Sequence, residues 1–313
     1  MDYFKVKTAS DLSKLHDDCY QNCSKATKTT FYQSMRRIER VYDKQLPEIK
    51  LAFIDNLEDF LTKLDDSKYS ENTKLTTLTN ILKLLKMIDA PLMTYNEWLN
   101  VLKTKTDSRQ KADKVVLQAR LKVLMEFEDI KKQVVEASNT YINDKVEFEK
   151  YRNFLILSLY TLQIPVRVSN FVNIKVVDDE VCTNDTENFL IVNGDCYKFV
   201  FNKYRTSHII GKKEIFVHDD TLKFLIDKWI SLYNTDSSNL LIISELNKRA
   251  MNGRQITDAL EKATIDIFGS TLTIDNIRAS YMKKIQDLDP DFHDKLDIAN
   301  ILGYSTTEVM DNH

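Results

Sequence analysis

Residues that interrupt regular backbone structure are scarce in this chain. Glycine occurs five times and proline four times in 313 residues, whereas Lys, Leu, Asp, Asn and Ile are abundant. Glycine destabilises a helix interior and proline breaks it, so a chain with few of either favours helices joined by few tight turns. The length leaves room for about two domains, each with a core of its own. The sequence therefore predicts a mainly α-helical protein with two domains.

Apolar residues recur at helical spacing throughout the first part of the chain. This periodicity predicts helices over 29–42 and 51–64, a third helix that starts after an N-cap at Asn72, and a long helix over 108–136. The polar stretch 138–143 then separates two helical patterns. We therefore place a helical N-terminal domain at residues 1–140 and a second domain at residues 141–313.

The second domain combines helices with a short β-rich section. It opens with a strongly apolar helix over 148–162, for which we predict central burial. Two β-rich runs, 189–192 and 196–201, are joined around Asn193-Gly194, a dipeptide that favours a hairpin because both residues tolerate positive φ. A third run, 214–217, completes a small antiparallel sheet, and helices resume after it. The expected fold is mainly α with a small antiparallel β-sheet.

Positive charge gathers in two segments although the net charge is −3. One segment, 103–122, carries two acids among its many basic residues, and the other, 203–213, carries none. Such patches are candidate contacts for DNA phosphates, and a solvated face is the other interpretation. The candidate DNA contacts are Lys103, Lys105, Arg109, Lys111, Lys114, Lys212 and Lys213.

Cysteine usage and hydropathy indicate where the chain works. Four cysteines and an N-terminus without an apolar core favour a reducing, intracellular setting with free thiols. No stretch is long and apolar enough for a membrane span. His16, Cys19 and Cys23 would share one helical face, but the Cys-x-x-Cys spacing of structural zinc sites is absent. We predict neither a metal nor a membrane partner.

Two lone arginines stand among apolar residues in separate segments. Arg167 lies in IPVRVSN and Arg278 lies in LTIDNIRASYM. An arginine on an apolar face is costly to bury unless an anion pairs with its planar fork, and the guanidinium group suits bidentate contact with phosphate. Each arginine alone fits an ordinary ion pair. Together they suggest a clamp on one phosphate.

Three strings carry a resemblance to a known family: IPVRVSNFVNIKV, FNKYRTSHIIGKKEIFV, and LTIDNIRASYM followed by LGYS. The second domain resembles the catalytic domain of the tyrosine recombinases, the phage-integrase family, and the first resembles their helical core-binding domain. The strings are most similar to versions from large eukaryotic DNA viruses and mobile elements. The resemblance implies double-stranded DNA as partner, a homotetramer on paired sites and no cofactor. For a viral protein it implies the nucleus, the viral factory or the virion as location.

The resemblance also implies roles for single residues. In the family a tyrosine hydroxyl attacks a DNA phosphate, two arginines neutralise the developing charge, and a lysine protonates the leaving oxygen. Arg167 and Arg278 match the two arginines. The lysine position aligns with Arg205, with Lys203 close by, and arginine holds its proton too tightly to be an efficient acid.

Three further positions depart from the family pattern. Asp275 stands where a histidine is usual, and Tyr304 follows Gly303 where the family has histidine or tryptophan. The nucleophilic tyrosine would fall at His313. Either the chain stops just before its tyrosine or the nucleophile is missing.

Three functions stay open at this point. The first is a site-specific recombinase that cleaves and rejoins DNA strands through a phosphotyrosine. The second is an inactive homologue that serves as a DNA-binding architectural protein. The third is a helical protein-interaction scaffold whose arginines form internal ion pairs.

Overall fold

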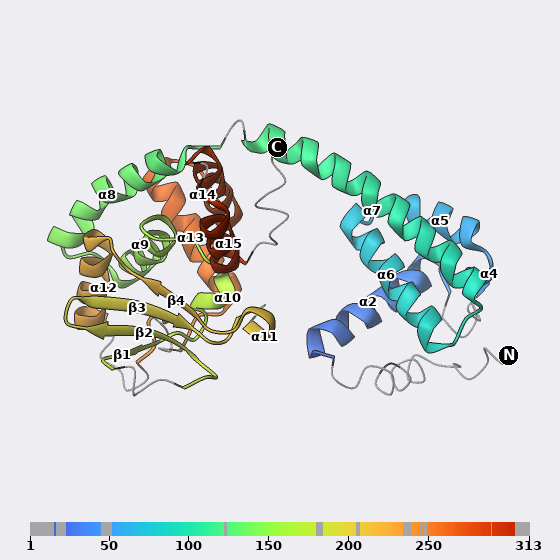
Figure 1. The fold of residues 1–313 in the computed structure, drawn as a ribbon, viewed down its shortest axis with the longest axis horizontal. Helices are drawn as coiled ribbons and strands as arrows, with labels where there is room; N and C mark the ends of the chain where they lie inside the picture. The colour runs from blue at the N-terminus through green and yellow to red at the C-terminus, as the bar shows by residue number, and fades with distance from the viewer. Residues whose placement is uncertain are drawn as a thin grey trace. The chain divides into compact units, whose positions relative to one another are not determined.

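The computed structural model describes residues 16, 23–44, 52–121, 124–179, 184–204, 207–233, 239–244, 246, 249–288 and 290–303, without the side chains of 113–121, 209, 292, 293 and 295. The chain divides into two compact units, Met1–Ala119 and Arg120–His313. The protein is mainly helical with one small sheet, as the sequence predicts (Figure 1).

The first unit is entirely helical in its described part. Its helices pack around a core of large apolar side chains that includes Phe31, Phe60, Leu78, Ile81 and Trp98. The apolar periodicity of the sequence is therefore the inward face of each helix. The helices are α2 (Lys25–Tyr42), α4 (Ala52–Asp55), α5 (Leu57–Asp65), α6 (Glu71–Met87) and α7 (Leu92–Leu121).

Polar caps set helix starts that periodicity alone misses. Asn56 accepts a hydrogen bond from the backbone N–H of Asp59 (3.2 Å), so the predicted helix over 51–64 is two helices, α4 and α5. The next helix starts after Ser70, which accepts from the N–H of Thr73 (3.3 Å), and not after Asn72 as predicted. A short side-chain acceptor satisfies an otherwise unpaired N–H at each start.

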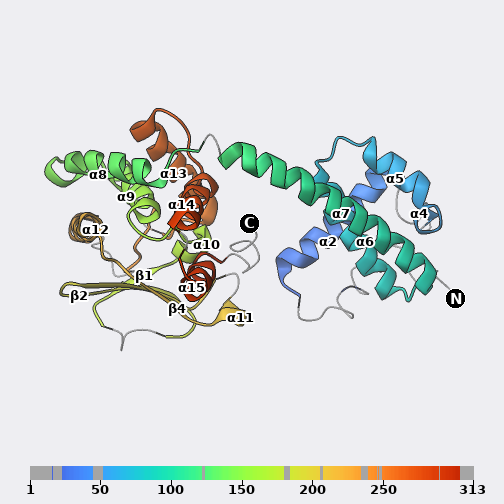
Figure 2. The same ribbon diagram turned by 45° about the horizontal axis from the view of Figure 1, so that its top comes forward.

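The second unit is built around one buried helix. Every residue of α9 from Tyr151 to Thr161 is buried, which agrees with the predicted central burial. Figures 1 and 2 show α8, α9 and α13 on one side of the sheet. The helices of this unit are α8 (Phe127–Asn143), α9 (Phe148–Thr161), α10 (Val168–Phe171), α11 (Ser207–Ile210), α12 (Asp220–Tyr233), α13 (Gly253–Phe268), α14 (Ile274–Leu288) and α15 (Phe292–Leu302).

The sheet has four strands in the order β1-β2-β3-β4. The strands are β1 (Lys175–Val177), β2 (Asn188–Asn193), β3 (Cys196–Phe201) and β4 (Lys213–Phe216). The last three pair antiparallel, as predicted, whereas β1 pairs parallel with β2. The sheet is therefore mixed, and not purely antiparallel. β1 is not predicted from the sequence, because a parallel strand is not joined to its partner by a tight turn with a recognisable sequence.

Two predicted helix boundaries differ from the structure. The single helix expected over 108–136 is two helices, since α7 ends at Leu121 and α8 begins at Phe127. The polar stretch 138–143, chosen as the domain boundary, lies inside α8. α8 belongs to the second unit because Phe127, Ile130 and Val134 are buried in that unit's core. The first compact unit consequently ends at Ala119 in the sequence, before the predicted boundary at residue 140.

Among the helices that the structure describes, none has the length and apolar character required to cross a membrane.

A lysine closes the C-terminal end of α8. The ammonium group of Lys228, on α12, donates to the backbone carbonyls of Tyr141 (2.8 Å), Ile142 (2.9 Å) and Asp144 (3.0 Å). These carbonyls lie at a helix end, where intrahelical partners are lacking and the helix dipole is negative. Lys228 thus fastens α8 to α12 through charge-assisted hydrogen bonds.

We expect Lys228→Met to lower the free energy of unfolding of the second unit by about 2 kcal/mol, the typical worth of hydrogen bonds to a charged group. Thermal unfolding measures the effect. Lys223→Met on the same helix is the matched control, because the ion pair that Lys223 forms within the described residues joins it to the exposed Asp220. Equal melting temperatures of the two variants would contradict this role.

Candidate functional site

Arg167 stands at the start of a short helix in the second unit. It is the N-cap residue of α10, with extended backbone (φ −71°, ψ 151°), and its carbonyl accepts from the N–H of Asn170 (2.9 Å). Its side chain is half-buried and donates through Nη2 to the backbone carbonyl of Gly303 (2.7 Å). Arg167 therefore reaches across the sequence to the end of α15.

Arg278 reaches the same place from α14. Its side chain is 2% exposed, and its Nη2 donates to the carbonyl of Leu302 at 2.7 Å. Its Nη1 donates to the carbonyl of Pro165 at 3.1 Å, two residues before Arg167. These bonds make burial of the guanidinium tolerable and hold the segment that carries Arg167. The two arginines thus meet at the C-terminal end of α15.

Lys213 is the third cation of the site. It is the first residue of β4 and pairs with Phe201 of β3, a core residue on the side of the sheet that the helices cover. Its side chain is buried, and its Nζ donates to the carbonyl of Ile301 at 3.4 Å. The sequence indicated Lys213 as a general DNA contact and named Arg205 and Lys203 for the lysine position. The structure brings Lys213 beside the two arginines, whereas Arg205 lies outside the described residues.

The three cations converge on three consecutive carbonyls, those of Ile301, Leu302 and Gly303. The C-terminal end of a helix is the negative end of its dipole and leaves carbonyls without intrahelical partners. Part of the arrangement is therefore a cap on α15. We name Arg167, Lys213 and Arg278 the cation cluster.

The pKa of Lys213 reflects both its burial and the crowding of positive charge in the cation cluster. Burial lowers the pKa of Lys213 from its ordinary 10.5 to about 8, and the positive charges of Arg167 and Arg278 add to this effect. A carboxylate beside the ammonium would act in the opposite direction. Like charges held together at such a cost are typical of an anion-binding site.

A buried asparagine joins the strands to the arginine segment. The Nδ2 of Asn188, at the start of β2, donates to the carbonyls of Asn170 (3.0 Å) and Lys203 (2.9 Å). Its Oδ1 accepts from the backbone N–H groups of Asn202 (3.0 Å) and Lys203 (2.8 Å). Because all its polar groups are used, Asn188 fixes α10 against the segment that follows β3.

The other predicted catalytic residues are only partly described. Lys203 is exposed just after β3, and Asp275 is exposed in the first turn of α14, where a negative charge suits the helix dipole. Arg205, Tyr304 and His313 lie outside the described residues.

The predicted DNA contacts of the first unit lie on α7. Lys103 and Lys111 are exposed, whereas Lys105 is paired with Asp65 (2.8 Å) and Arg109 is half-buried. The side chain of Lys114 lies outside the described residues. In the second unit, the exposed Lys212 pairs with Glu214 (2.6 Å).

The described residues contain no group of three or more His, Cys, Asp or Glu side chains that could hold a metal. Of the three residues that would share one helical face, His16, Cys19 and Cys23, Cys19 lies outside the described residues.

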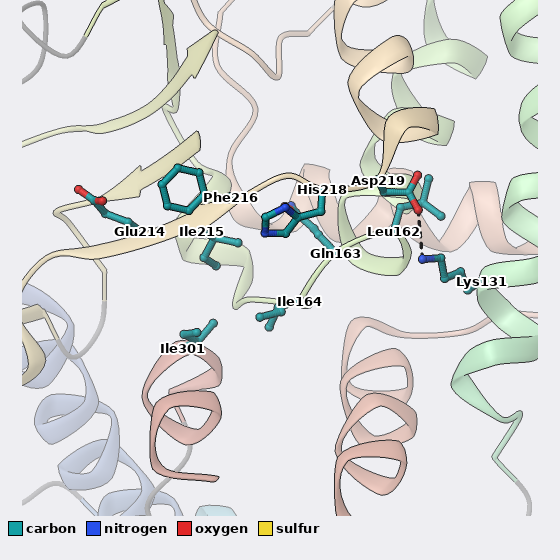
Figure 3. Close-up of a pocket in the computed structure, with 10 residues that line it drawn as sticks. All are labelled: Lys131, Leu162, Gln163, Ile164, Glu214, Ile215, Phe216, His218, Asp219 and Ile301. Atoms are coloured by element: carbon teal, nitrogen blue, oxygen red, sulfur yellow. Dashed lines mark ion pairs between the residues drawn. The ribbon is translucent and has the colours of Figure 1, made fainter. Parts of the chain in front are cut away.

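A pocket of about 440 Å³ lies next to the cation cluster in the second unit (Figure 3). Its walls are partly apolar and partly polar, and its two carboxylates, Glu214 and Asp219, disfavour an anion. Asp219 forms an ion pair with Lys131 (3.1 Å). The cation cluster is therefore the better anion site. The pocket is lined by Lys131, Leu162, Gln163, Ile164, Glu214, Ile215, Phe216, His218, Asp219 and Ile301.

We expect Gly303→Ala to weaken anion binding. Gly303 has φ +71°, and an added Cβ would lie 3.1 Å from Nε of Arg167, so the guanidinium must move. Gly269→Ala is the matched control, because Gly269 also ends a helix at φ +69° but a Cβ there meets nothing within 4 Å. Both variants should lose about 1 kcal/mol of stability from the left-handed backbone.

The two alanine variants differ in their response to sulfate. Sulfate should raise the melting temperature of the natural chain and of Gly269→Ala, but much less that of Gly303→Ala. If sulfate raised the melting temperatures of the two variants equally, Gly303 would have no part in anion binding.

We expect Lys213→Met to stabilise the protein at neutral pH. The charged form of Lys213 is disfavoured in the folded state, so the unfolded chain binds more protons between about pH 8 and pH 10.5 and natural stability rises with pH over that window. The advantage of Lys213→Met in melting temperature should therefore shrink above about pH 8. A pH-independent difference would contradict the lowered pKa.

No protein-family model and no curated protein matches this sequence. Among the solved structures that are similar to this chain, two recombinase structures match it over nearly its whole length. The crystal structure of XerA recombinase has 13% sequence identity and a TM-score of 0.40, and the match covers 96% of this chain and 90% of that chain. The crystal structure of XerH site-specific recombinase bound to difH substrate, a pre-cleavage complex, has 12% identity and a TM-score of 0.47, with coverage of 97% and 94%.

Proposed function

We propose that this chain binds double-stranded DNA and that the cation cluster holds one backbone phosphate at which a strand is cleaved and rejoined. The convergence of Arg167, Lys213 and Arg278 from three separate segments carries this proposal. A single cation would cap α15 adequately, whereas three cations that repel one another need an anion to balance them. A DNA phosphate is such an anion.

The chemistry of the three groups suits phosphoryl transfer. A guanidinium group offers parallel N–H donors that match two oxygens of a phosphate. When a nucleophile attacks phosphorus, negative charge grows on the nonbridging oxygens, and fixed cations stabilise that charge most. Arg167 and Arg278 take this role, since both are anchored to backbone carbonyls.

Lys213 is the group suited to protonate the leaving oxygen. A general acid works best when its pKa lies near the working pH, and the pKa of Lys213 is about 8. At neutral pH the ammonium is mostly charged yet gives up its proton far more readily than an ordinary lysine. In the full reaction, a tyrosine oxygen forms the bond to phosphorus and its hydroxyl proton passes to solvent, the bond from phosphorus to the 5′ oxygen breaks, and that oxygen takes a proton from the Lys213 ammonium.

A second function uses the same phosphate site without cleavage. Asp275 is exposed at the start of the helix that carries Arg278, where the family resemblance implies a histidine donor. A carboxylate there favours an architectural DNA-binding protein that has lost the reaction. For either function we propose an intracellular chain that assembles as a homotetramer on paired DNA sites.

Binding to duplex DNA is tested by measuring affinity over a range of salt concentrations. Lys213→Met should reduce the slope of log affinity against log salt by about 1, because one phosphate contact is lost. This variant is expected to be more stable, so unfolding cannot explain the loss. Lys228→Met is expected to be less stable, but Lys228 caps α8 and is not part of the cation cluster, so this variant should bind DNA as the natural chain does. Absence of binding at any salt leaves only the scaffold function.

DNA sequences that the chain binds are first selected from a random pool of duplexes. Cleavage is then tested with nicked suicide duplexes of these sequences, in which a cleaved strand cannot be rejoined. A covalent protein–DNA adduct on a denaturing gel supports the recombinase function, and binding without adduct supports the architectural one. Lys213→Met should fail on ordinary DNA but regain cleavage when sulfur replaces the leaving 5′ oxygen, since a thiolate leaves without a proton. Equal failure on both substrates would remove Lys213 from the acid role.

A further inference from the structure

The cation cluster raises a mechanical question about Lys213. Arg167 and Arg278 are each fixed by a hydrogen bond of 2.7 Å to a carbonyl, whereas the hydrogen bond that the Lys213 ammonium donates to the carbonyl of Ile301 is longer, at 3.4 Å. A lysine side chain has four rotatable methylene groups, and the two guanidinium groups repel its charge. Without a further contact the ammonium would turn away from the cluster.

The ring of Tyr204 supplies that contact. The Nζ of Lys213 lies 4.2 Å from the centroid of the Tyr204 ring, within the range of a cation–π interaction. The carbonyl of Ile301 accepts from the same Nζ. The ammonium is thus held between an aromatic face and a carbonyl oxygen.

The ring is itself held in place by the connection between β3 and β4. The Tyr204 hydroxyl donates to the carbonyl of Gly211 at 2.6 Å. The Tyr204 carbonyl accepts from Ser207 through both its N–H (3.2 Å) and its Oγ (3.0 Å). Gly211, at φ +84°, closes this loop with a bond from its N–H to the carbonyl of Ser207 (2.8 Å). Both ends of the Tyr204 residue are therefore anchored independently of the cation cluster.

We propose that Tyr204 is the positioning residue of the site, whose ring keeps the Lys213 ammonium beside Arg167 and Arg278 before a phosphate arrives. In catalytic terms this role rests on the proposed function, since Lys213 then meets its substrate already in place. The contact between the Tyr204 ring and the Lys213 ammonium is itself present in the chain without DNA. Within the described part of the chain, the groups that face the ammonium are Arg167 at the N-cap of α10, Arg278 from α14, the Ile301 carbonyl from α15 and the Tyr204 ring.

Progressive fluorination of the ring tests the proposal. Phenylalanine and its mono-, di- and trifluoro analogues are placed at position 204 of the full chain by amber suppression, which weakens the cation–π attraction while the ring size stays nearly constant. The pKa of Lys213 is followed by NMR of the chain labelled at the lysine ε-carbons, with the Lys213→Met spectrum assigning the resonance. A constant ring size matters because a smaller side chain would also change the burial of Lys213.

We expect the pKa of Lys213 to fall stepwise along the series, by about half a unit to one unit in total. A pKa that is constant or rises would overturn the positioning role. The resonance of Lys228, whose contact with Tyr151 does not involve position 204, is the internal control and should stay unchanged.

The outcome separates this proposal from the proposed function. If the pKa of Lys213 falls stepwise and the DNA affinity and its salt dependence are unchanged by Lys213→Met, the positioning role is supported and the phosphate site is refuted. DNA binding that depends on Lys213, together with a pKa indifferent to fluorination, refutes the positioning role and leaves the phosphate site in place.

Discussion

The convergence of Arg167, Lys213 and Arg278 on the last carbonyls of α15 is the constraint on which the rest of the second unit depends. A helix end needs donors for its unpaired carbonyls, and a buried guanidinium needs acceptors for its N–H groups. The carbonyls at the helix end accept hydrogen bonds from the guanidinium groups, so both requirements are met at once. Arg278 can therefore sit at 2% exposure in an otherwise apolar core, and it ties α14, α15 and the segment before α10 together.

This arrangement couples the geometry of the site to the fold. The carbonyls of Leu302 and Gly303 accept from the same guanidinium groups that would contact a phosphate. The position of the α15 end and the spacing of the two arginines are consequently one constraint. Gly303 shows how tight it is, because even a methyl group there would meet Arg167.

The same cluster works against stability. Three cations in one place lower the pKa of Lys213, which means that the folded state bears a cost whenever Lys213 is charged. A chain selected for stability alone would replace this lysine with an apolar residue. The lowered pKa is also the reason why the proposed function assigns the acid role to Lys213 and not to Arg205, because arginine does not release its proton near neutral pH.

Much of the fold is determined locally and can be predicted from the sequence. Few glycines and prolines and a clear helical periodicity predict a mainly helical chain, and alternating β-rich runs around Asn193-Gly194 predict the hairpin of β2 and β3. The structure places the two-residue loop at Gly194-Asp195, because Asn193 still pairs with Cys196. These signals arise within a few residues of one another, so they survive without knowledge of the tertiary structure.

Other features are decided only by contacts between distant segments. The sequence linked Arg167 to Arg278, since both are costly to bury without an anion. It did not separate Lys213 from its basic neighbours, because the choice depends on the register of β4 against β3 and on the position of α15, residues far away in the chain. Parallel pairing of β1 and the role of Tyr204 arise in the same way. The sequence by itself determined which arginines are costly to bury without a partner, and the tertiary structure decided which side chains meet, because three-dimensional proximity between distant segments leaves no local pattern.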